Sequence, residues 1–249
     1  MVNDFSISEK NILIVGATSG LGRAFVTHSA GQDSRLYITG RNCAVLDELK
    51  KEYPGKIHLN KGCDIRSKEE RDNYISSIET QLNGVVFFSG ITEYAPLKFQ
   101  SEKSIFDLID TNFTSNILFL QELSKRKKIA PSSSVVFLSS VSAQRGGSPG
   151  ISIYAATKGA VESVVRVLSL EFAKSRVRIN AIAPGLVMTP MMTQQTSLTP
   201  EQLKEQEKKY PLGYGKPEDI SNLIQFLISD ASQWITGTTI TIDGGYSNS

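Results

Sequence analysis

The sequence is poor in the residues that build metal centres and disulfide frameworks. Its 249 residues include only two cysteines, Cys43 and Cys63, and two histidines, His28 and His58. None of the four lies in a metal-ligand spacing. We therefore expect a reduced, cytoplasmic protein without a structural metal, in which these residues pack or lie at the surface.

Strong charge and long apolar runs are also absent. The 27 basic and 25 acidic residues give a formal net charge of +2, too little to indicate nucleic acid or a membrane surface as the main partner. No stretch approaches the roughly 20 apolar residues of a spanning helix, and the first residues do not resemble a signal peptide. With 40% hydrophobic residues, the composition is that of a globular protein.

Short β-branched runs alternate with segments of helical spacing along the whole chain. Strands are expected at residues 11–15, 35–39, 56–59, 84–88, 134–138, 177–181 and 238–242. Helices are expected at residues 21–30, 44–52, 68–81, 104–127, 153–174 and 217–227. Continuous apolar strands separated by helices predict one doubly wound α/β domain of the Rossmann type over residues 1–249, with a parallel seven-stranded sheet covered on both faces.

One segment interrupts this alternation. Residues 188–210, within an insertion at about 186–215, are polar and helix-forming where the pattern calls for a prompt return to the next helix. Such a connection is typical of a lid or binding loop, and a surface helix without function would have the same sequence features. Met191, Met192 and Leu198 give it an apolar character, which favours a hydrophobic or acyl substrate.

A glycine-rich turn follows the first expected strand. It contains Gly16, Thr18, Ser19, Gly20, Leu21 and Gly22 and opens directly into a helical pattern. Such a turn lets backbone N–H groups approach a pyrophosphate at a helix N-terminus. Glycines also mark ordinary turns, so the motif has weight only because it follows the first strand of an alternating chain.

Tyr154 and Lys158 form a Tyr-x-x-x-Lys pair, which lies on one face of a helix. The pair occurs readily by chance, and Tyr94 with Lys98 is a second match in this sequence. That second pair encloses Pro96, which breaks a helix. Only Tyr154 and Lys158 begin a long helix. There the lysine ammonium should lower the pKa of the tyrosine phenol and so suit it to acid–base catalysis, which makes the two residues the candidate catalytic pair.

Taken in order, these motifs resemble those of the short-chain dehydrogenase/reductase family. The family's cofactor turn is usually Thr-Gly-x-x-x-Gly-Ile-Gly, and this sequence has Val15 and Leu21 at the first and penultimate positions. Residues 180–185, 211–213, 217–220 and 242–245 extend the resemblance over essentially the whole chain. Several motifs in the right order are far more specific than any single one.

The end of the second strand normally decides between NAD(H) and NADP(H). An acid there would accept from the ribose hydroxyls and repel a 2′-phosphate, but the residues are Thr39-Gly40-Arg41-Asn42. Arg41 can offer a planar cation to the phosphate, although it could also be a solvated loop charge. We predict NADP(H) over NAD(H), with Asn42 as a further contact. Other contacts implied by the resemblance are Asp64, Ile65, Ser89, Gly90, Pro184, Gly185, Val187 and Thr189. Asp64 could instead cap the following helix.

The resemblance also implies a role for each candidate catalytic residue. Tyr154 would donate the proton and Lys158 would stabilise its phenolate; both also count as cofactor contacts at the nicotinamide ribose. Ser140 would orient the carbonyl, with Ser139 as the structural alternative, because neighbouring strand residues face opposite sides. Asn112 would bend its helix and support a water relay to Lys158.

One segment departs from the family pattern. The family commonly has Asn-Asn-Ala-Gly after the fourth strand, where this chain has Phe87-Phe88-Ser89-Gly90. The amides usually brace the central sheet, so their replacement by aromatic rings predicts a repacked neighbourhood and an altered cofactor wall.

These features predict an NADPH-dependent carbonyl reductase, nearest in pattern to the 3-oxoacyl-acyl-carrier-protein reductases. A basic cluster, Lys125 to Lys128 with Lys174, Arg176 and Arg178, could receive an acyl-carrier protein or could be a solvated helix end. An alcohol or sugar dehydrogenase working oxidatively would use the same residues, and a catalytically silent dinucleotide-binding protein is the third alternative. Family members usually assemble as homodimers or homotetramers, so we expect the apolar helices at 104–119 and 161–170 to pack between subunits, although their own sheet could instead cover both of them.

Overall fold

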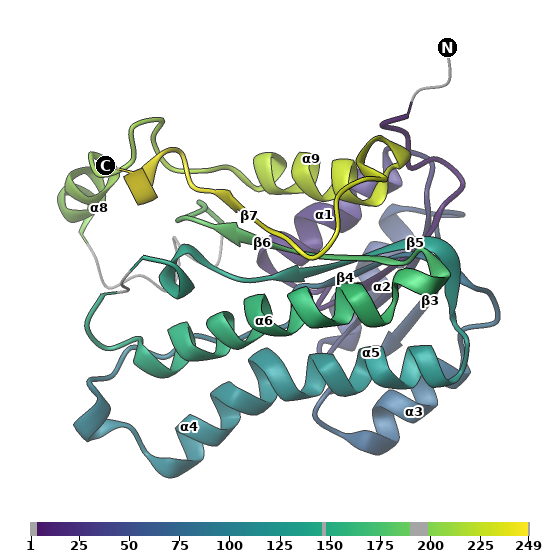
Figure 1. Cartoon of the computed structure of the whole chain (residues 1–249), viewed down its shortest axis with the longest axis horizontal. Helices are drawn as coiled ribbons and strands as arrows, with labels where there is room; N and C mark the ends of the chain where they lie inside the picture. Colours follow the sequence, from purple (N-terminus) through teal and green to yellow (C-terminus); the bar gives the residue numbers. More distant parts are fainter. Residues whose placement is uncertain (1–3, 146–147, 190–198, 249) are drawn as a thin grey trace.

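The structure is a computed structural model of the chain, and it describes residues 4–145, 148–189 and 199–248. Its centre is a parallel sheet of seven strands in the order β3-β2-β1-β4-β5-β6-β7 (Figure 1). The strands are β1 (Asn11–Val15), β2 (Arg35–Gly40), β3 (Ile57–Gly62), β4 (Leu82–Phe87), β5 (Ile129–Leu138), β6 (Arg178–Pro184) and β7 (Thr239–Ile242). The predicted fold class is therefore confirmed.

Helices cover both faces of this sheet (Figure 1). They are α1 (Gly20–Ala30), α2 (Cys43–Glu52), α3 (Lys68–Ser76), α4 (Glu102–Ile109), α5 (Ser115–Lys125), α6 (Ser152–Glu171), α8 (Pro200–Glu207) and α9 (Pro217–Ile228). Among the described helices, none is both long and apolar enough to cross a bilayer.

The core consists of two layers because the side chains of a strand alternate between the faces of the sheet. In β1, Leu13 and Val15 belong to the layer under α3, α5 and α6. Their neighbours Ile12 and Ile14 belong to the opposite layer, under α1, α2 and α9. Since both faces are covered, the central strands β1 and β4 are buried along almost their whole length, and their apolar runs are the pattern that identified them.

Two helix predictions were wrong in extent. The helix expected at 104–127 is divided into α4 and α5 by a π-helical turn at Asp110–Thr114, where the Asn116 amide donates to the carbonyls of Thr111 and Asn112. The helix expected at 68–81 ends at Ser76. Ser76 donates its hydroxyl to the carbonyl of Asp72 (2.7 Å), a local bond that competes with helix continuation.

The insertion contains a helix, α8, that begins at a capping box. Thr199 Oγ1 accepts from the Gln202 N–H (3.3 Å), and Gln202 Oε1 accepts from the Thr199 N–H (2.9 Å). Val187 pairs with Gly215 across the base of the insertion. Met191, Met192 and Leu198, which carried the expectation of an apolar lid, lie outside the described residues.

Candidate active site

Two adjacent cavities open at the carboxyl ends of the strands. The larger has a volume of about 380 Å³ and the smaller about 90 Å³. Ser19, Phe88 and Gly90 line both of them, and these residues follow β1 and β4, the neighbouring strands at which the chain order of the sheet reverses. Ligands of open α/β sheets bind at this switch point.

The glycine turn after β1 forms a close backbone cradle. A Cβ atom on Gly16, whose φ is +89°, would lie 2.9 Å from the backbone nitrogen of Ser89. A Cβ atom on Gly22 would lie 2.1 Å from the carbonyl oxygen of Gly16. No side chain caps α1 at Ser19, and its first turn carries no acid. The first N–H groups of α1 are therefore available to an anionic group such as a pyrophosphate.

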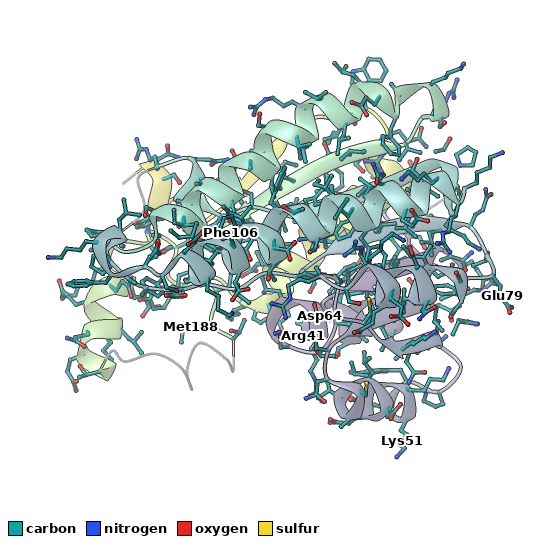
Figure 2. The ribbon with its side chains drawn as sticks, turned by 90° about the horizontal axis from the view of Figure 1, so that it is seen from below. Arg41, Lys51, Asp64, Glu79, Phe106 and Met188 are labelled. Atoms are coloured by element: carbon teal, nitrogen blue, oxygen red, sulfur yellow. The ribbon has the colours of Figure 1, made fainter. Side chains whose placement is uncertain are left out.

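The smaller cavity brings Arg41 beside Asp64 (Figure 2). Arg66, which sequence reasoning missed, also lines it and holds Asp64 in an ion pair, with its Nη2 2.7 Å and its Nε 3.1 Å from the carboxylate oxygens. These hydrogen bonds lower the pKa of Asp64. Ser67 caps α3, so the alternative role of Asp64 as that cap was wrong.

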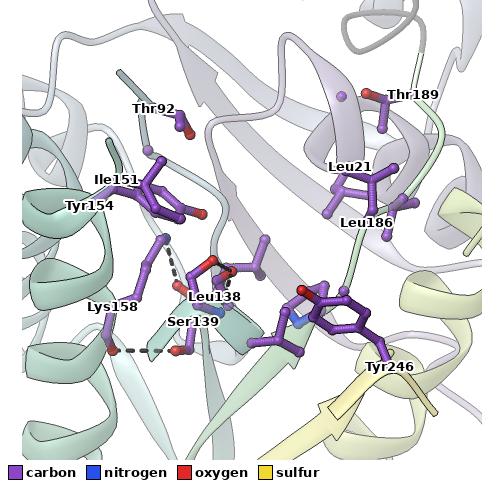
Figure 3. A pocket seen from close by; sticks show the side chains of 18 of the residues that line it. Leu21, Thr92, Leu138, Ser139, Ile151, Tyr154, Lys158, Leu186, Thr189 and Tyr246 are labelled. Atoms are coloured by element: carbon purple, nitrogen blue, oxygen red, sulfur yellow. Dashed lines mark hydrogen bonds between the residues drawn. The ribbon is translucent and has the colours of Figure 1, made fainter. Parts of the chain in front are cut away.

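Tyr154 and Lys158 lie on the first turns of α6 and face the larger cavity (Figure 3). Lys158 Nζ lies 5.6 Å from the centroid of the Tyr154 ring and donates to the carbonyl of Leu138 at 2.8 Å. Gly90 lies opposite, where a Cβ would be 3.5 Å from the same nitrogen. Burial lowers the pKa of Lys158 from 10.5 to about 8.

Tyr154 does not have the lowered pKa that its lysine neighbour led us to expect. Burial raises the pKa of the Tyr154 phenol above its ordinary value of 10.0, and hydrogen bonds with the side chains of Ser140 and Thr92 act in the opposite direction. Desolvation thus outweighs the hydrogen bonds in its effect on the pKa of the phenol. Tyr154 is consequently protonated at neutral pH.

The geometry distinguishes Ser140 from Ser139. The Ser139 hydroxyl is directed at α6, with the Glu162 carboxylate at 2.8 Å and the carbonyl of Lys158 at 3.3 Å. The Ser140 hydroxyl contacts the Tyr154 phenol and accepts from the N–H of Ser142 at 3.2 Å. Ser140 is therefore the serine placed beside the tyrosine.

Asn112 lies in the π-helical turn and is 1% exposed. Its Oδ1 accepts from the Ile91 N–H (2.7 Å), and its Nδ2 donates to the Ile91 carbonyl (3.0 Å) and to Thr157 Oγ1 (3.2 Å). Asn112 lines neither cavity and its amide is fully engaged. In this arrangement it fixes the chain after β4 against α6.

Most other predicted residues converge on the cavities. The larger cavity is lined by Ser19, Gly20, Leu21, Gly22, Gly90, Ser140, Tyr154, Lys158, Pro184, Gly185, Val187 and Thr189. The smaller is lined by Gly16, Thr18, Ser19, Arg41, Asp64, Ile65, Ser89 and Gly90. Asn42 lines neither, because its side chain caps α2 by accepting from the Val45 N–H at 3.3 Å.

The two phenylalanines after β4 have separate environments. Phe87 is 1% exposed and stacks on Phe137 of β5, with ring centroids 4.7 Å apart. Phe88 packs on Phe25 of α1 at 5.8 Å and lines both cavities. Ring packing thus braces the sheet at Phe87, whereas Phe88 forms part of the wall of both cavities.

Several residues of the larger cavity were not predicted. They include Thr92, Tyr94, Arg145, Ile151, Tyr210 and Tyr246. Each lies in a connection or at a helix end, and a single sequence contains no periodic signal for such positions. Of the second Tyr-x-x-x-Lys match, which encloses Pro96, Tyr94 lines the larger cavity and Lys98 does not.

The described residues form neither a disulfide nor a cluster of metal ligands. Cys43 and Cys63 are unpaired, and burial raises the pKa of the Cys63 thiol to about 12, which leaves it unreactive. No group of three or more His, Cys, Asp or Glu side chains among the described residues could hold a metal ion.

Comparisons with known proteins agree with this arrangement. A family model described as enoyl-(acyl carrier protein) reductase matches residues 16–247. A tropinone reductase homolog of Arabidopsis thaliana is 31% identical over 97% of this chain and 92% of its own length. A short-chain type dehydrogenase/reductase from Mycobacterium ulcerans superposes with a TM-score of 0.88 at 26% identity, covering 97% of this chain and 91% of that one.

The fold and the site together define an oxidoreductase of the kind that binds a nicotinamide dinucleotide. The chain belongs to the short-chain dehydrogenase/reductase family.

Proposed function

We propose that the protein is an NADP(H)-dependent reductase that converts a ketone to a secondary alcohol, with Tyr154 as the proton donor. The observation that carries this proposal is the convergence of Ser140, Tyr154 and Lys158 on the same cavity as the glycine cradle. The proposed enzyme is a single domain whose insertion at about 186–215 borders that cavity. Its two unpaired cysteines agree with a reducing compartment, the cytoplasm.

The lining of the two cavities supports the binding of a dinucleotide. The uncapped first turn of α1 would hold the pyrophosphate, Pro184, Gly185, Val187 and Thr189 would border the nicotinamide, and Lys158 would contact its ribose. When bound, this group supplies the hydride.

NADP(H) is favoured over NAD(H) by the charges around the smaller cavity. Arg41 is exposed at its edge, and the carboxylate of Asp64 is already paired with Arg66. A 2′-phosphate would therefore meet a guanidinium without an uncompensated acid beside it.

The protein's own groups would handle the carbonyl oxygen. Ser140 would donate a hydrogen bond to this oxygen, and Tyr154 would give it a proton as negative charge develops. The raised pKa of Tyr154 keeps the phenol protonated at neutral pH, as proton donation requires. Lys158 would return a proton to the phenolate, and its pKa of about 8 suits that transfer near neutrality.

The oxidative alternative would use the same residues, with Tyr154 as a phenolate base. The catalytically silent alternative was motivated by Phe87 and Phe88. Phe87 lies in the core, away from both cavities, and although Phe88 lines both of them, Ser140, Tyr154 and Lys158 still share the larger cavity, which supports a catalytic role.

The exposure of apolar and basic side chains bears on the protein's partners. Phe106 (60% exposed), Ile109 (39%) and Leu118 (36%) form exposed apolar positions on α4 and α5, which supports assembly as a homodimer or homotetramer. A carrier-protein partner has less support. Arg178 is 8% exposed and donates to the carbonyls of Leu227 and Ser229, so it cannot belong to an exposed basic cluster.

The test is the consumption of NADPH and of NADH against a panel of ketones, diketones, keto sugars and β-ketoacyl thioesters. We expect turnover with NADPH that is abolished in Tyr154→Phe. In Arg41→Gln, kcat/KM for NADPH should fall by about tenfold while that for NADH stays within about twofold. Tight NADPH binding without turnover of any substrate would favour the silent alternative.

A further inference from the structure

Arg145 differs from most arginines of the described chain. Side-chain ion pairs or hydrogen bonds engage Arg23, Arg35, Arg66, Arg71, Arg126 and Arg178. Within the described residues, no carboxylate and no side-chain hydrogen bond engages the guanidinium of Arg145, yet this residue lines the larger cavity together with Ser140 and Tyr154.

The described wall of the larger cavity carries no negative charge. Among the described residues that line the larger cavity, none is acidic, and the cations are Lys158 and Arg145. Lys158 is buried behind Tyr154 and bonded to the carbonyl of Leu138. Residues 146–147 and 190–198, whose placement is not described, read Gly-Gly and PMMTQQTSL and contain no acid in any case. Arg145 is thus the cation in this cavity that remains for a ligand.

The segment that carries Arg145 is anchored to the catalytic helix. Its neighbour Gln144 donates from Nε2 to Glu162 of α6 at 3.0 Å and accepts from Thr241 Oγ1 at 2.7 Å. The N–H of Arg145 donates to the carbonyl of Val141 at 3.0 Å. The backbone of Arg145 is therefore fixed relative to α6. Ligand binding then does not incur the entropic cost of ordering a mobile loop.

We propose that the substrate is a compact ketone that carries an anionic group, a carboxylate or a phosphate, which binds Arg145 while its carbonyl oxygen lies between Ser140 and Tyr154. The inference rests on the proposed reductase function. The ketone carbon takes up a hydride and the oxygen takes up a proton, giving the secondary alcohol, and the anionic group is unchanged. The substrate must be compact because the cavity of about 380 Å³ also has to receive the nicotinamide.

The test compares ketones that differ in charge and little else. With NADPH, kcat/KM is measured for levulinate and methyl levulinate, and for dihydroxyacetone phosphate and dihydroxyacetone. We expect the anionic member of at least one pair to be preferred, with the pair identifying carboxylate or phosphate as the recognised group. In Arg145→Gln the ratio of anionic to neutral kcat/KM should fall by about tenfold, mainly through KM, because a charge-assisted hydrogen bond is lost.

Arg166→Gln is the matched control, since Arg166 is exposed on α6 and lines neither cavity; the ratio should not change in it. Equal kcat/KM within both pairs, or a preference that persists in Arg145→Gln, would overturn the proposal.

A second measurement separates this inference from the proposed function. Binding of levulinate and of dihydroxyacetone phosphate to the protein saturated with NADP⁺, in which the ketone cannot be reduced, is followed by calorimetry. Binding that is weakened in Arg145→Gln, together with no turnover by NADPH, would uphold the anion site and refute the reductase. Turnover of neutral ketones alone, with no anion binding, would do the reverse.

Discussion

Replacing Lys158 by methionine should stabilise the nucleotide-free protein while removing its activity. Lys158 is 5% exposed, and burial lowers its pKa from 10.5 to about 8. Keeping the ammonium charged in the folded state at pH 7 therefore costs about 3 kcal/mol, since one pKa unit corresponds to about 1.4 kcal/mol. Loss of the hydrogen bond to the carbonyl of Leu138 offsets about 1–2 kcal/mol of this. The net gain at pH 7 is about 1–2 kcal/mol.

The stabilising effect of Lys158→Met should decrease as the pH rises. Below the folded-state pKa of about 8, the lysine is charged in both states and the full cost applies. Between that value and 10.5, the unfolded chain binds the additional proton, so the stability of the natural protein rises with pH. At pH 9.5 the remaining cost is about 1 kcal/mol, which the lost hydrogen bond cancels. The advantage of Lys158→Met should therefore disappear.

Urea unfolding of both proteins at pH 7 and pH 9.5, at one protein concentration and without nucleotide, measures this difference. Lys51→Met is the control, because Lys51 is exposed on α2 (Figure 2) and its replacement should change the free energy of unfolding by less than about 0.5 kcal/mol. If Lys158→Met is less stable than the natural protein at pH 7, or if the difference is the same at both pH values, the reasoning from a costly buried charge is refuted.

Three further substitutions test the framework around the site. In Gly22→Ala, the added Cβ would lie 2.1 Å from the carbonyl oxygen of Gly16, so calorimetry should show NADPH affinity reduced by at least about tenfold; unchanged affinity would contradict the close approach. Phe87→Ala removes the ring stacked on Phe137 and should lower the free energy of unfolding by about 3–5 kcal/mol in a denaturant titration. A loss of less than about 1 kcal/mol would contradict this prediction. Glu162→Gln weakens the acceptor of two hydrogen bonds and should lower kcat by several-fold while the dissociation constant of NADPH stays unchanged. Equal losses of kcat and of NADPH affinity would instead indicate general unfolding.

The sequence could predict those parts of the site that depend on local spacing. Tyr154 and Lys158 are one helical turn apart, so their common face follows from the period of the helix. The glycine cradle follows from its place between the first strand and the first helix. By contrast, Thr92 and Arg145 reach the cavity from connections after β4 and β5. Their convergence depends on the order of strands in the sheet, which no single segment encodes.

The π-helical turn shows another limit. Apolar periodicity continues across residues 104–127, so it predicts one helix. The irregular turn depends on hydrogen bonds of Asn112 and Asn116 to backbone groups, and an isolated asparagine in a helical pattern does not specify them. The sequence did contain one indication of the irregular turn, because asparagine is unfavourable inside helices. The resemblance to the family predicted the bend at Asn112.

The pair that departs from the family pattern combines two separable effects. Successive side chains of a strand point to opposite faces, and Phe87 and Phe88 accordingly enter different layers, one under α5 and α6 and the other against α1. Phe87 contributes stacking energy to the core and contacts neither cavity, whereas Phe88 forms a wall that both cavities share. A change at position 87 should therefore act on stability and a change at position 88 on ligand binding. This separation explains how the family's amides could be replaced by two aromatic rings without displacing Tyr154 or Lys158.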